Sequence, residues 1–209
     1  MDLSKLALLA SGASLLIALA TFWFTHLRPF KLSISTSSPR LSMYKIPPHI
    51  SGDSENRTWW IPSFDVGVSV FNNGKMKGDF NDIRILGSIQ NHRSEKKMYF
   101  YPKWVVDFSQ FNQSHTERFE WLSNSIVRDW YPFRIGSEQE VSMHLIIEGD
   151  RLDHKEVGRF NFELQVSTSE SDGWQTLEDF ELLFSEDMYD EKSTHTPLNK
   201  KIERLRKIA

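Results

Sequence analysis

The side chains that most often do chemistry in proteins are present in this chain, but their spacing matches no catalytic motif. The sequence contains seven histidines and no cysteine, so disulfides, thiolate metal sites and cysteine nucleophiles are excluded. It contains no Gly-x-Ser-x-Gly elbow, no glycine-rich phosphate loop, no dinucleotide-binding fingerprint and no His-Glu-x-x-His pair. Serine, histidine and aspartate all occur, but their order along the chain cannot reveal a catalytic triad. We therefore predict a non-enzymatic protein that needs no cofactor.

The histidines and carboxylates do not show the spacing of a metal site. His144 falls in the polar phase of an alternating segment, which favours a solvent-facing or hydrogen-bonded ring over a metal ligand. Acidic residues gather toward the end of the chain, but the Asp-x-Asp spacing and glycine turn of a calcium loop are missing there. We interpret this group as a solvated acidic edge and linker. Its members are Glu178, Asp179, Glu181, Glu186, Asp187, Asp190 and Glu191.

Aromatic side chains in loop-like sequence are the candidates for a ligand- or partner-binding surface. Exposed tryptophans can bind the face of a sugar, a peptide or the membrane interface. The same side chains can instead seal the open ends of a β-domain as part of its core, and we favour this second interpretation. The candidates are Trp59, Trp60, Trp121, Trp130 and Tyr131.

These candidates depend on the elements that carry them, and the first element is an apolar helix. Residues 6–25 contain no charged side chain. A helix of that length spans about 30 Å, the thickness of the hydrocarbon core of a bilayer. Phe22 and Trp23 fall where interfacial aromatic residues lie, so we predict a transmembrane anchor over residues 1–27. A cleaved signal peptide is the alternative, because Ala18-Leu19-Ala20 fits the cleavage rule, but the apolar run continues beyond it.

An acidic central body lies between two basic ends. Residues 1–50 carry five basic residues against one acidic residue, and residues 197–209 do the same. An acidic body repels a phosphate backbone, so we expect no nucleic-acid partner. Positive charge prefers the cytoplasmic side, and its excess after the helix favours a cytoplasmic body. The basic residues that we expect at a lipid surface are Arg28, Lys31, Lys200, Lys201, Arg204 and Lys207.

The body of the chain has the period of β-strands. After Lys31, apolar and polar residues alternate, most clearly in residues 64–71 and 160–166. Asn72-Asn73-Gly74 follows the first of these runs as a turn signal. No repeated helical pattern separates the strands, so we predict an all-β fold, an antiparallel β-sandwich over residues 28–190.

Two segments depart from this alternating pattern. A short helix is expected within residues 107–131, where apolar residues have helical spacing. Residues 191–209 are predicted to form a basic, partly helical tail, in which Leu198, Ile202 and Leu205 share one face.

Two short motifs resemble those of a widespread, uncharacterised set of small bacterial membrane proteins. The first is Leu27-Arg28-Pro29-Phe30-Lys31-Leu32, directly after the helix, and the second is VSVFNNGKMKGD, residues 68–79. The proteins resembled have one N-terminal transmembrane helix, a Leu-Arg-Pro juncture and an immunoglobulin-like β-sandwich. The resemblance implies this anchor and this fold, and it brings no catalytic residues with it.

These features predict a single-pass protein of the inner (plasma) membrane whose sandwich acts as an interaction or scaffold module. Tethering raises the effective concentration of the body for an unidentified, membrane-proximal protein partner. Ser11, Gly12 and Ser14 would allow the helix to pack against a second copy and form a homo-oligomer. The alternative function is an extracytoplasmic domain that binds a glycan or another ligand through the loop tryptophans.

Overall fold

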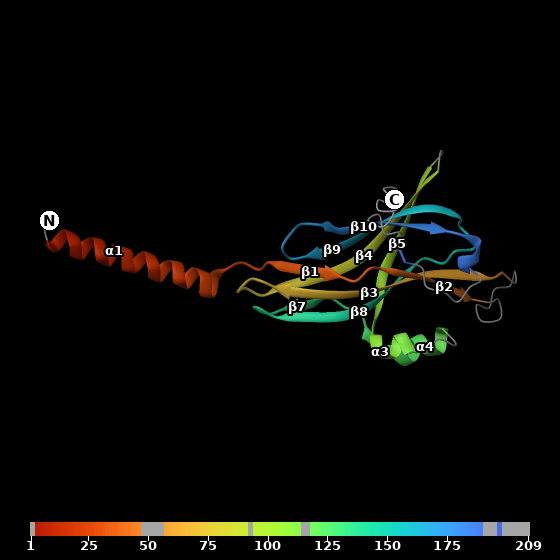
Figure 1. Ribbon diagram of the computed structural model, residues 1–209, viewed down its shortest axis with the longest axis horizontal. Coiled ribbons are helices and arrows are strands. Elements are labelled where there is room, and N and C mark those ends of the chain that lie inside the picture. Colours follow the sequence, from red (N-terminus) through yellow and green to blue (C-terminus); the bar gives the residue numbers. More distant parts are fainter. Residues whose placement is uncertain (1–2, 47–56, 92–93, 114–117, 190–195, 198–209) are drawn as a thin grey trace, which may run out of the picture.

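An apolar helix that stands clear of the body opens the chain, in a computed structural model that describes residues 3–46, 57–91, 94–113, 118–189 and 196–197. α1 (Leu3–Phe22) continues as a π-helical turn, η1 (Trp23–Leu27), and no residue of either segment is buried. Within the described residues, Leu3–Leu27 is the one helix that is long and apolar enough to cross a membrane, with a mean hydropathy of 2.0. It projects away from the β-rich body (Figure 1). The expected apolar helix is confirmed, and it fits a membrane anchor or a signal sequence.

The strands of the described residues all belong to one antiparallel sheet. Its main order is β1-β3-β8-β5-β4-β9-β10, while β2 pairs with β3, β6 with β5 and β7 with β4. The strands are β1 (Leu32–Thr36), β2 (Arg40–Ile46), β3 (Trp59–Asn72), β4 (Gly78–Asn91), β5 (Ser94–Val106), β6 (Ile126–Asp129), β7 (Phe133–Ile135), β8 (Glu140–Gly149), β9 (Gly158–Thr168) and β10 (Trp174–Phe184).

The prediction of an immunoglobulin-like, two-sheet sandwich is wrong. The chain forms a single sheet that curls into a half-barrel. Alternation of apolar and polar residues only requires that one face of a strand be buried, so it cannot distinguish two stacked sheets from one curled sheet. Register shifts at β-bulges, such as those between Phe80 and Asp82 and between Pro102 and Trp104, provide sites where the long strands can bend.

The curl brings its first and last strands close to each other. The hydroxyl of Thr36 in β1 donates to a carboxylate oxygen of Glu178 in β10 at 3.4 Å. The indole N–H of Trp60 in β3 donates to the carbonyl of Tyr189, which lies in the 3-10 turn η2 (Glu186–Tyr189), at 3.2 Å. Side-chain contacts therefore bridge the open seam that backbone pairing would close in a complete barrel.

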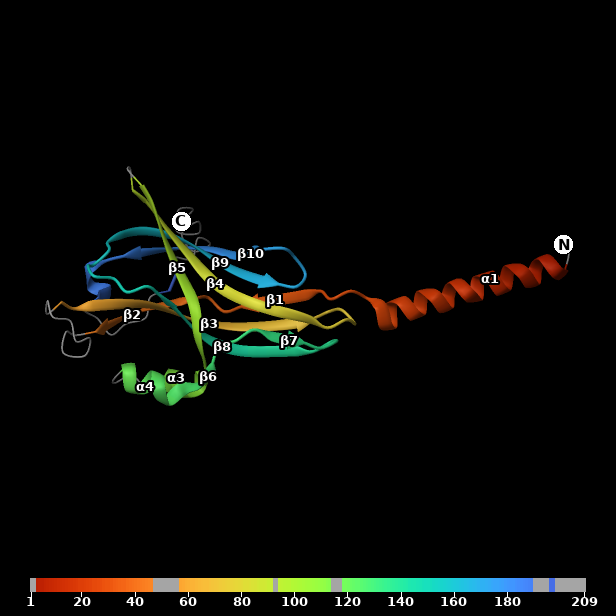
Figure 2. The ribbon, with the colours of Figure 1, turned by 180° about the vertical axis from the view of Figure 1, so that it is seen from behind.

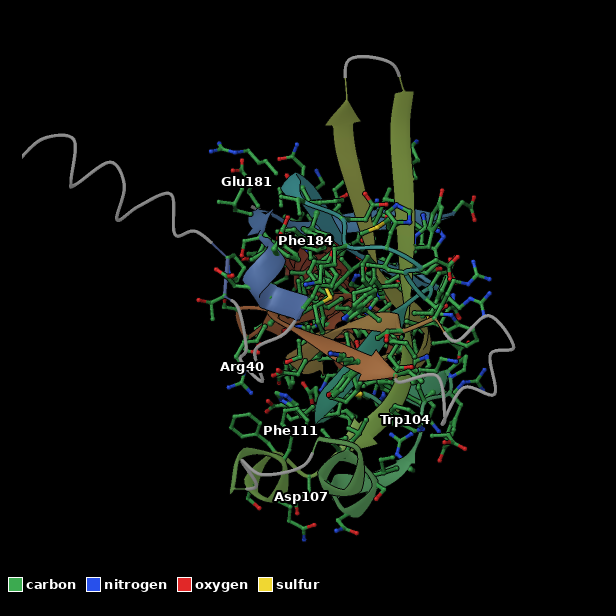
Figure 3. All side chains as sticks on the ribbon, turned by 90° about the vertical axis from the view of Figure 1, so that its right-hand side faces the viewer. Arg40, Trp104, Asp107, Phe111, Glu181 and Phe184 are labelled. Atoms are coloured by element: carbon green, nitrogen blue, oxygen red, sulfur yellow. The ribbon has the colours of Figure 1, made fainter. Side chains whose placement is uncertain are left out.

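Aromatic side chains fill the interior of the curl. Phe64 is fully buried, and its ring lies edge-on to Phe100, Phe162 and Phe180 at centroid distances of 5.1, 5.2 and 5.7 Å. Figure 3 shows the packed interior, in which Phe184 also lies. The expected alternation is confirmed here, because the apolar residues of 160–166 are all buried on one face of β9.

Two short helices cover part of the outer face of the sheet. They are α3 (Phe108–Gln113) and α4 (Arg118–Ser125), within the segment where one short helix was expected. Phe111 and Leu122 from these helices join Tyr44, Val106 and Ile146 in a second, smaller apolar cluster. Figure 2 shows the helices beside β8 from behind, and Figure 3 shows Phe111 between the helices and the sheet. The predicted tail helix falls almost wholly outside the described residues.

Candidate functional site on the outer face of the sheet

An open groove of about 570 Å³ lies on the outer face of the sheet, beside the start of α3. Its floor comes from β1, β3 and β8, which present small or hydroxyl-bearing residues outward, with Ser69 paired to Ser142 and Gly67 paired to His144. Phe108, at the start of α3, adds an aromatic side chain to the lining beside these strands. The residues that line the groove are Ser35, Thr36, Ser37, Gly67, Val68, Ser69, Val106, Phe108, Ser142, Met143 and His144.

A buried carboxylate organises one end of the groove. The side chain of Asp65 is 4% exposed, and its Oδ1 lies 2.7 Å from the Arg40 guanidinium and 3.0 Å from Nε2 of His144. An ionised carboxylate only accepts hydrogen bonds, so this contact places the proton of a neutral His144 on Nε2. The His144 ring is also held from the outside, because the ring centroid of Phe108 lies 4.5 Å away.

The second ring nitrogen of His144 faces the groove. A Cβ built on Gly67 would lie 3.5 Å from Nδ1 of His144 and 3.2 Å from the hydroxyl oxygen of Ser37. Gly67 therefore leaves an opening between these two polar groups that any larger residue would fill. With the proton on Nε2, Nδ1 presents a lone pair and can accept a hydrogen bond from a ligand.

A chain of hydroxyl groups continues from this point along the groove floor. The hydroxyl of Ser142 donates to that of Ser69 at 3.0 Å, and the hydroxyl of Ser69 donates to a carboxylate oxygen of Glu140 at 2.7 Å. At the other rim, the Ser37 hydroxyl accepts from the backbone N–H of Gly67 at 2.7 Å. The groove thus combines hydrogen-bonding groups on its floor with the exposed Phe108 ring on one side.

The arrangement is suited to binding and lacks the contacts of a nucleophilic triad. Ser37, Asp65 and His144 are residues of the triad types, and the fold brings them to one groove. Among the hydrogen bonds of the described residues, none joins Ser37 to His144, and the Ser37 hydroxyl is engaged with the Gly67 backbone. A triad requires the base to accept directly from the nucleophile. In the described residues there is also no cluster of three His, Asp or Glu side chains able to hold a metal ion.

The sequence contains little that would identify this groove in advance. Asp65 and His144 are 79 positions apart and come from strands that are not consecutive in the chain. The available signal was the placement of both residues in the polar phase of strongly alternating segments, together with a glycine two residues after Asp65. Only the pairing of β3 with β8 brings them into contact.

The tryptophans chosen from the sequence occupy different places. Trp60 and Trp130 are partly buried and pack against the main core. Trp60 contacts the ring of Tyr189 edge-on at 5.6 Å, and Trp130 contacts Phe80 and Phe133 at 5.9 and 5.8 Å. Both side chains therefore pack against the core, and the binding role predicted for the group stays untested.

The indole N–H of Trp130 has a specific acceptor. It donates to Oδ1 of Asp82 at 3.2 Å. Burial raises the pKa of Asp82 above its usual value, while the hydrogen bonds from the Ile83 backbone and from Trp130 oppose that rise.

The remaining members of the predicted aromatic surface are more exposed or are not described. Trp59 is partly buried, with the Arg151 guanidinium 4.0 Å above its ring. Tyr131 is exposed, with Arg128 4.7 Å above its ring. Trp121 belongs to α4, and its side chain lies outside the described residues.

Another aromatic surface, on the outer face of β4, β5 and β10, was not predicted from the sequence. The Arg84 guanidinium lies 3.9 Å above the ring of Trp174 and 5.6 Å from that of Tyr99. Tyr99 in turn stacks with Tyr101 at 6.4 Å. Gln165 accepts from Arg84 at 2.8 Å, so the guanidinium is held over one face of the Trp174 ring.

The two motifs that carried the family resemblance bind each other. The guanidinium of Arg28 donates to the carbonyl of Asn73, and the backbone N–H of Asn73 donates to the carbonyl of Lys31 at 2.8 Å. The backbone N–H groups of Lys75 and Met76 donate to the carbonyl of Arg28 at 2.9 and 3.2 Å. The helix exit is therefore fastened to the β3–β4 turn. The predicted lipid-contact residues Lys200, Lys201, Arg204 and Lys207 lie outside the described residues.

Comparisons with known proteins assign the chain to no family. No protein-family model and no curated protein matches it. A distant structural match is a crystal structure described as the "Putative ApaA Protein from Bordetella pertussis", with a TM-score of 0.29 and 8% sequence identity. The match covers 76% of this chain and 98% of the other. At that similarity it supports no inference about activity, and what is shown is an apolar N-terminal helix followed by a β-rich domain.

Proposed function

We propose that this protein is a membrane-anchored binding module, in which α1 holds the half-barrel at the bilayer and the outer-face groove receives a protein partner. The observation that carries the proposal is the combination of a wholly exposed apolar helix with a helix exit that is hydrogen-bonded to the β3–β4 turn. A helix without a buried residue is not stabilised by packing against the body, whereas a bilayer would bury its whole apolar surface. The fastened exit would then hold the body close to the membrane.

The charges around the helix exit support a body on the cytoplasmic side. Arg28 and Lys31 follow the helix in sequence, and Lys75 and Lys77 lie on the turn to which the exit is fastened. Before the apolar run, the printed sequence has Lys5, offset by Asp2. By the positive-inside rule, this asymmetry favours retention of the body in the cytoplasm.

The groove has an apolar surface and a hydrogen-bonding surface, which suit a side chain and the backbone of a protein partner. Phe108 offers an apolar wall, and Nδ1 of His144 offers an acceptor for an N–H or O–H group. A partner loop or strand would place an apolar side chain against Phe108 and donate to His144. Tethering would raise the local concentration of the groove for a partner in or near the same membrane.

Membrane extraction and cysteine labelling test the anchor and the side of the body. The chain has no cysteine, so Leu183→Cys introduces a single thiol at an exposed position of β10. We expect the full chain to stay in the membrane during alkaline extraction, and its intact mass to show that the N-terminal residues have not been removed. The thiol should react with an impermeant maleimide only in inside-out vesicles. Deletion of residues 1–27 should release it to the soluble fraction. A mature N-terminus after Ala20 would refute the anchor, and labelling only in right-side-out vesicles would refute the cytoplasmic body.

Photo-cross-linking tests the groove. A benzophenone amino acid at Ser35, on the rim of the groove, should give an adduct of one discrete mass in membranes, and the same probe at Leu183 on β10 should not. His144→Phe keeps a ring against Phe108 but removes the nitrogens, and should weaken the adduct by about threefold to tenfold, the cost of one hydrogen bond. Equal adducts from both probe positions, or an adduct insensitive to His144→Phe, would contradict binding in the groove.

A further inference from the structure

We propose that the β3–β4 turn, residues 73–77, is a membrane-contact surface that rests on anionic lipid headgroups beside the exit of α1. The proposal rests on the membrane anchorage described above and adds a second point of contact between the protein and the bilayer. Three observations carry it: the position of the turn relative to the helix exit, the rigidity of the turn, and the side chains that it exposes.

The position of the turn follows from its hydrogen bonds. η1 ends at Leu27, and the carbonyl of the next residue, Arg28, accepts the backbone N–H groups of Lys75 and Met76. In Figures 1 and 2 the β3–β4 turn lies at the end of the body that faces the helix. With the exposed Trp23 in the interfacial layer, a turn bonded to Arg28 lies at the level of the headgroups.

The turn is rigid because its backbone is bonded on both sides. The side-chain amide of Asn72 donates to the carbonyl of Met76 at 2.8 Å, and its oxygen accepts from the N–H of Gly74 at 2.8 Å. A Cβ on Gly74 would overlap the carbonyl oxygen of Pro29, and one on Gly78 would overlap the ring of Phe30. The turn can therefore approach the juncture this closely only with glycine at both positions, and its backbone is held in place beside the helix exit.

The side chains that this rigid turn exposes suit an anionic bilayer surface. Met76 is 52% exposed, although its backbone is bonded through both N–H and carbonyl. Lys77 is exposed and forms no ion pair in the described part of the chain. Lys75 pairs with Glu138 at 2.7 Å, and this contact holds the pKa of Glu138 below its usual value. The Glu138 carboxylate therefore stays ionised, and its negative charge is balanced by Lys75. An exposed apolar side chain beside a free lysine is the pattern of a surface that enters the headgroup layer.

The test uses the full chain in lipid vesicles and an environment-sensitive fluorophore. Met76→Cys labels the turn in a protein with no other thiol. Val157→Cys is the matched control, because Val157 is 53% exposed. Val157 directly precedes the start of β9, whereas Thr168 at the other end of β9 pairs with Phe80 near the turn, so the control lies far from the turn. Vesicles contain either zwitterionic lipid alone or added phosphatidylserine, with and without headgroup-nitroxide lipid.

We expect a blue shift and nitroxide quenching of the probe at position 76, stronger in anionic vesicles, and neither effect at position 157. Adding Lys77→Glu should remove the gain from anionic lipid. Equal quenching at the two positions, or quenching at position 76 that does not depend on lipid charge, would overturn the proposal. If the protein still floats with the vesicles in that case, the anchor is not contradicted. Loss of co-flotation would instead refute the anchor, and this inference with it.

Discussion

Replacing Phe64 with alanine is expected to destabilise the half-barrel by about 3–5 kcal/mol. Phe64 is fully buried, and its ring contacts the rings of Phe100, Phe162 and Phe180. These contacts join β3 to β5, β9 and β10. Only β8 separates β3 from β5, but β9 and β10 lie far from β3 in the strand order and meet it only because the sheet curls. A cavity at this point removes apolar contacts from several strands at once, and the cost is large against a typical domain stability of about 5–15 kcal/mol.

The measurement is urea unfolding of the full chain in detergent, followed by tryptophan fluorescence. Leu183→Ala is the matched control, because Leu183 lies on β10 and is 56% exposed. It should change the free energy of unfolding by less than about 0.5 kcal/mol. A Phe64→Ala variant as stable as the Leu183→Ala variant would contradict the packing of four strands around this ring.

Replacing Gly74 with alanine is expected to detach the helix exit from the β3–β4 turn without unfolding the sheet. The added Cβ would overlap the carbonyl oxygen of Pro29 and lie 2.8 Å from its carbonyl carbon, and both are backbone atoms that no rotamer change can move. Relief requires the juncture and the turn to separate, at a cost of about 1–3 kcal/mol. The hydrogen bonds from Lys75 and Met76 to the carbonyl of Arg28 would then be lost or weakened.

Hydrogen exchange measured by mass spectrometry reports this separation. Peptides that cover residues 73–77 should exchange about tenfold faster or more in Gly74→Ala, while peptides of the β9 core keep their protection. Gly12→Ala is the control with the same chemical change, because nothing lies within 4 Å of a Cβ at that position. Unchanged exchange in residues 73–77 would show that the turn does not depend on its contact with Pro29.

Part of the fold follows from local patterns that the sequence displays directly. The apolar run before Leu27 predicts an apolar helix long enough to cross a membrane, and the alternation in residues 64–71 and 160–166 predicts strands whose apolar phase is buried. Both elements are present. These features are visible because they depend on residues a few positions apart. The short helix expected within residues 107–131 was a weaker signal, and the structure has two helices there, α3 and α4.

The sandwich prediction failed because it concerned relations between strands. Whether β3 and β10 face each other across two sheets or through the curl of one depends on bulges and strand twist, and neither changes the alternation that was used. The candidate groove was missed for a related reason. Asp65, His144 and Arg40 come from three strands, and each residue alone is an ordinary polar residue on an outward-facing position.

The sequence by itself determined the apolar helix, the phase of the strands and the absence of cysteine chemistry, because composition and short-range period decide these properties. Only the tertiary structure decided that one sheet curls on itself, that His144 is held by Asp65 beside an open groove, and that the juncture after the helix binds the turn at Gly74. Each of these contacts joins segments separated by many residues, so its formation depends on strand register and close packing across the whole sheet.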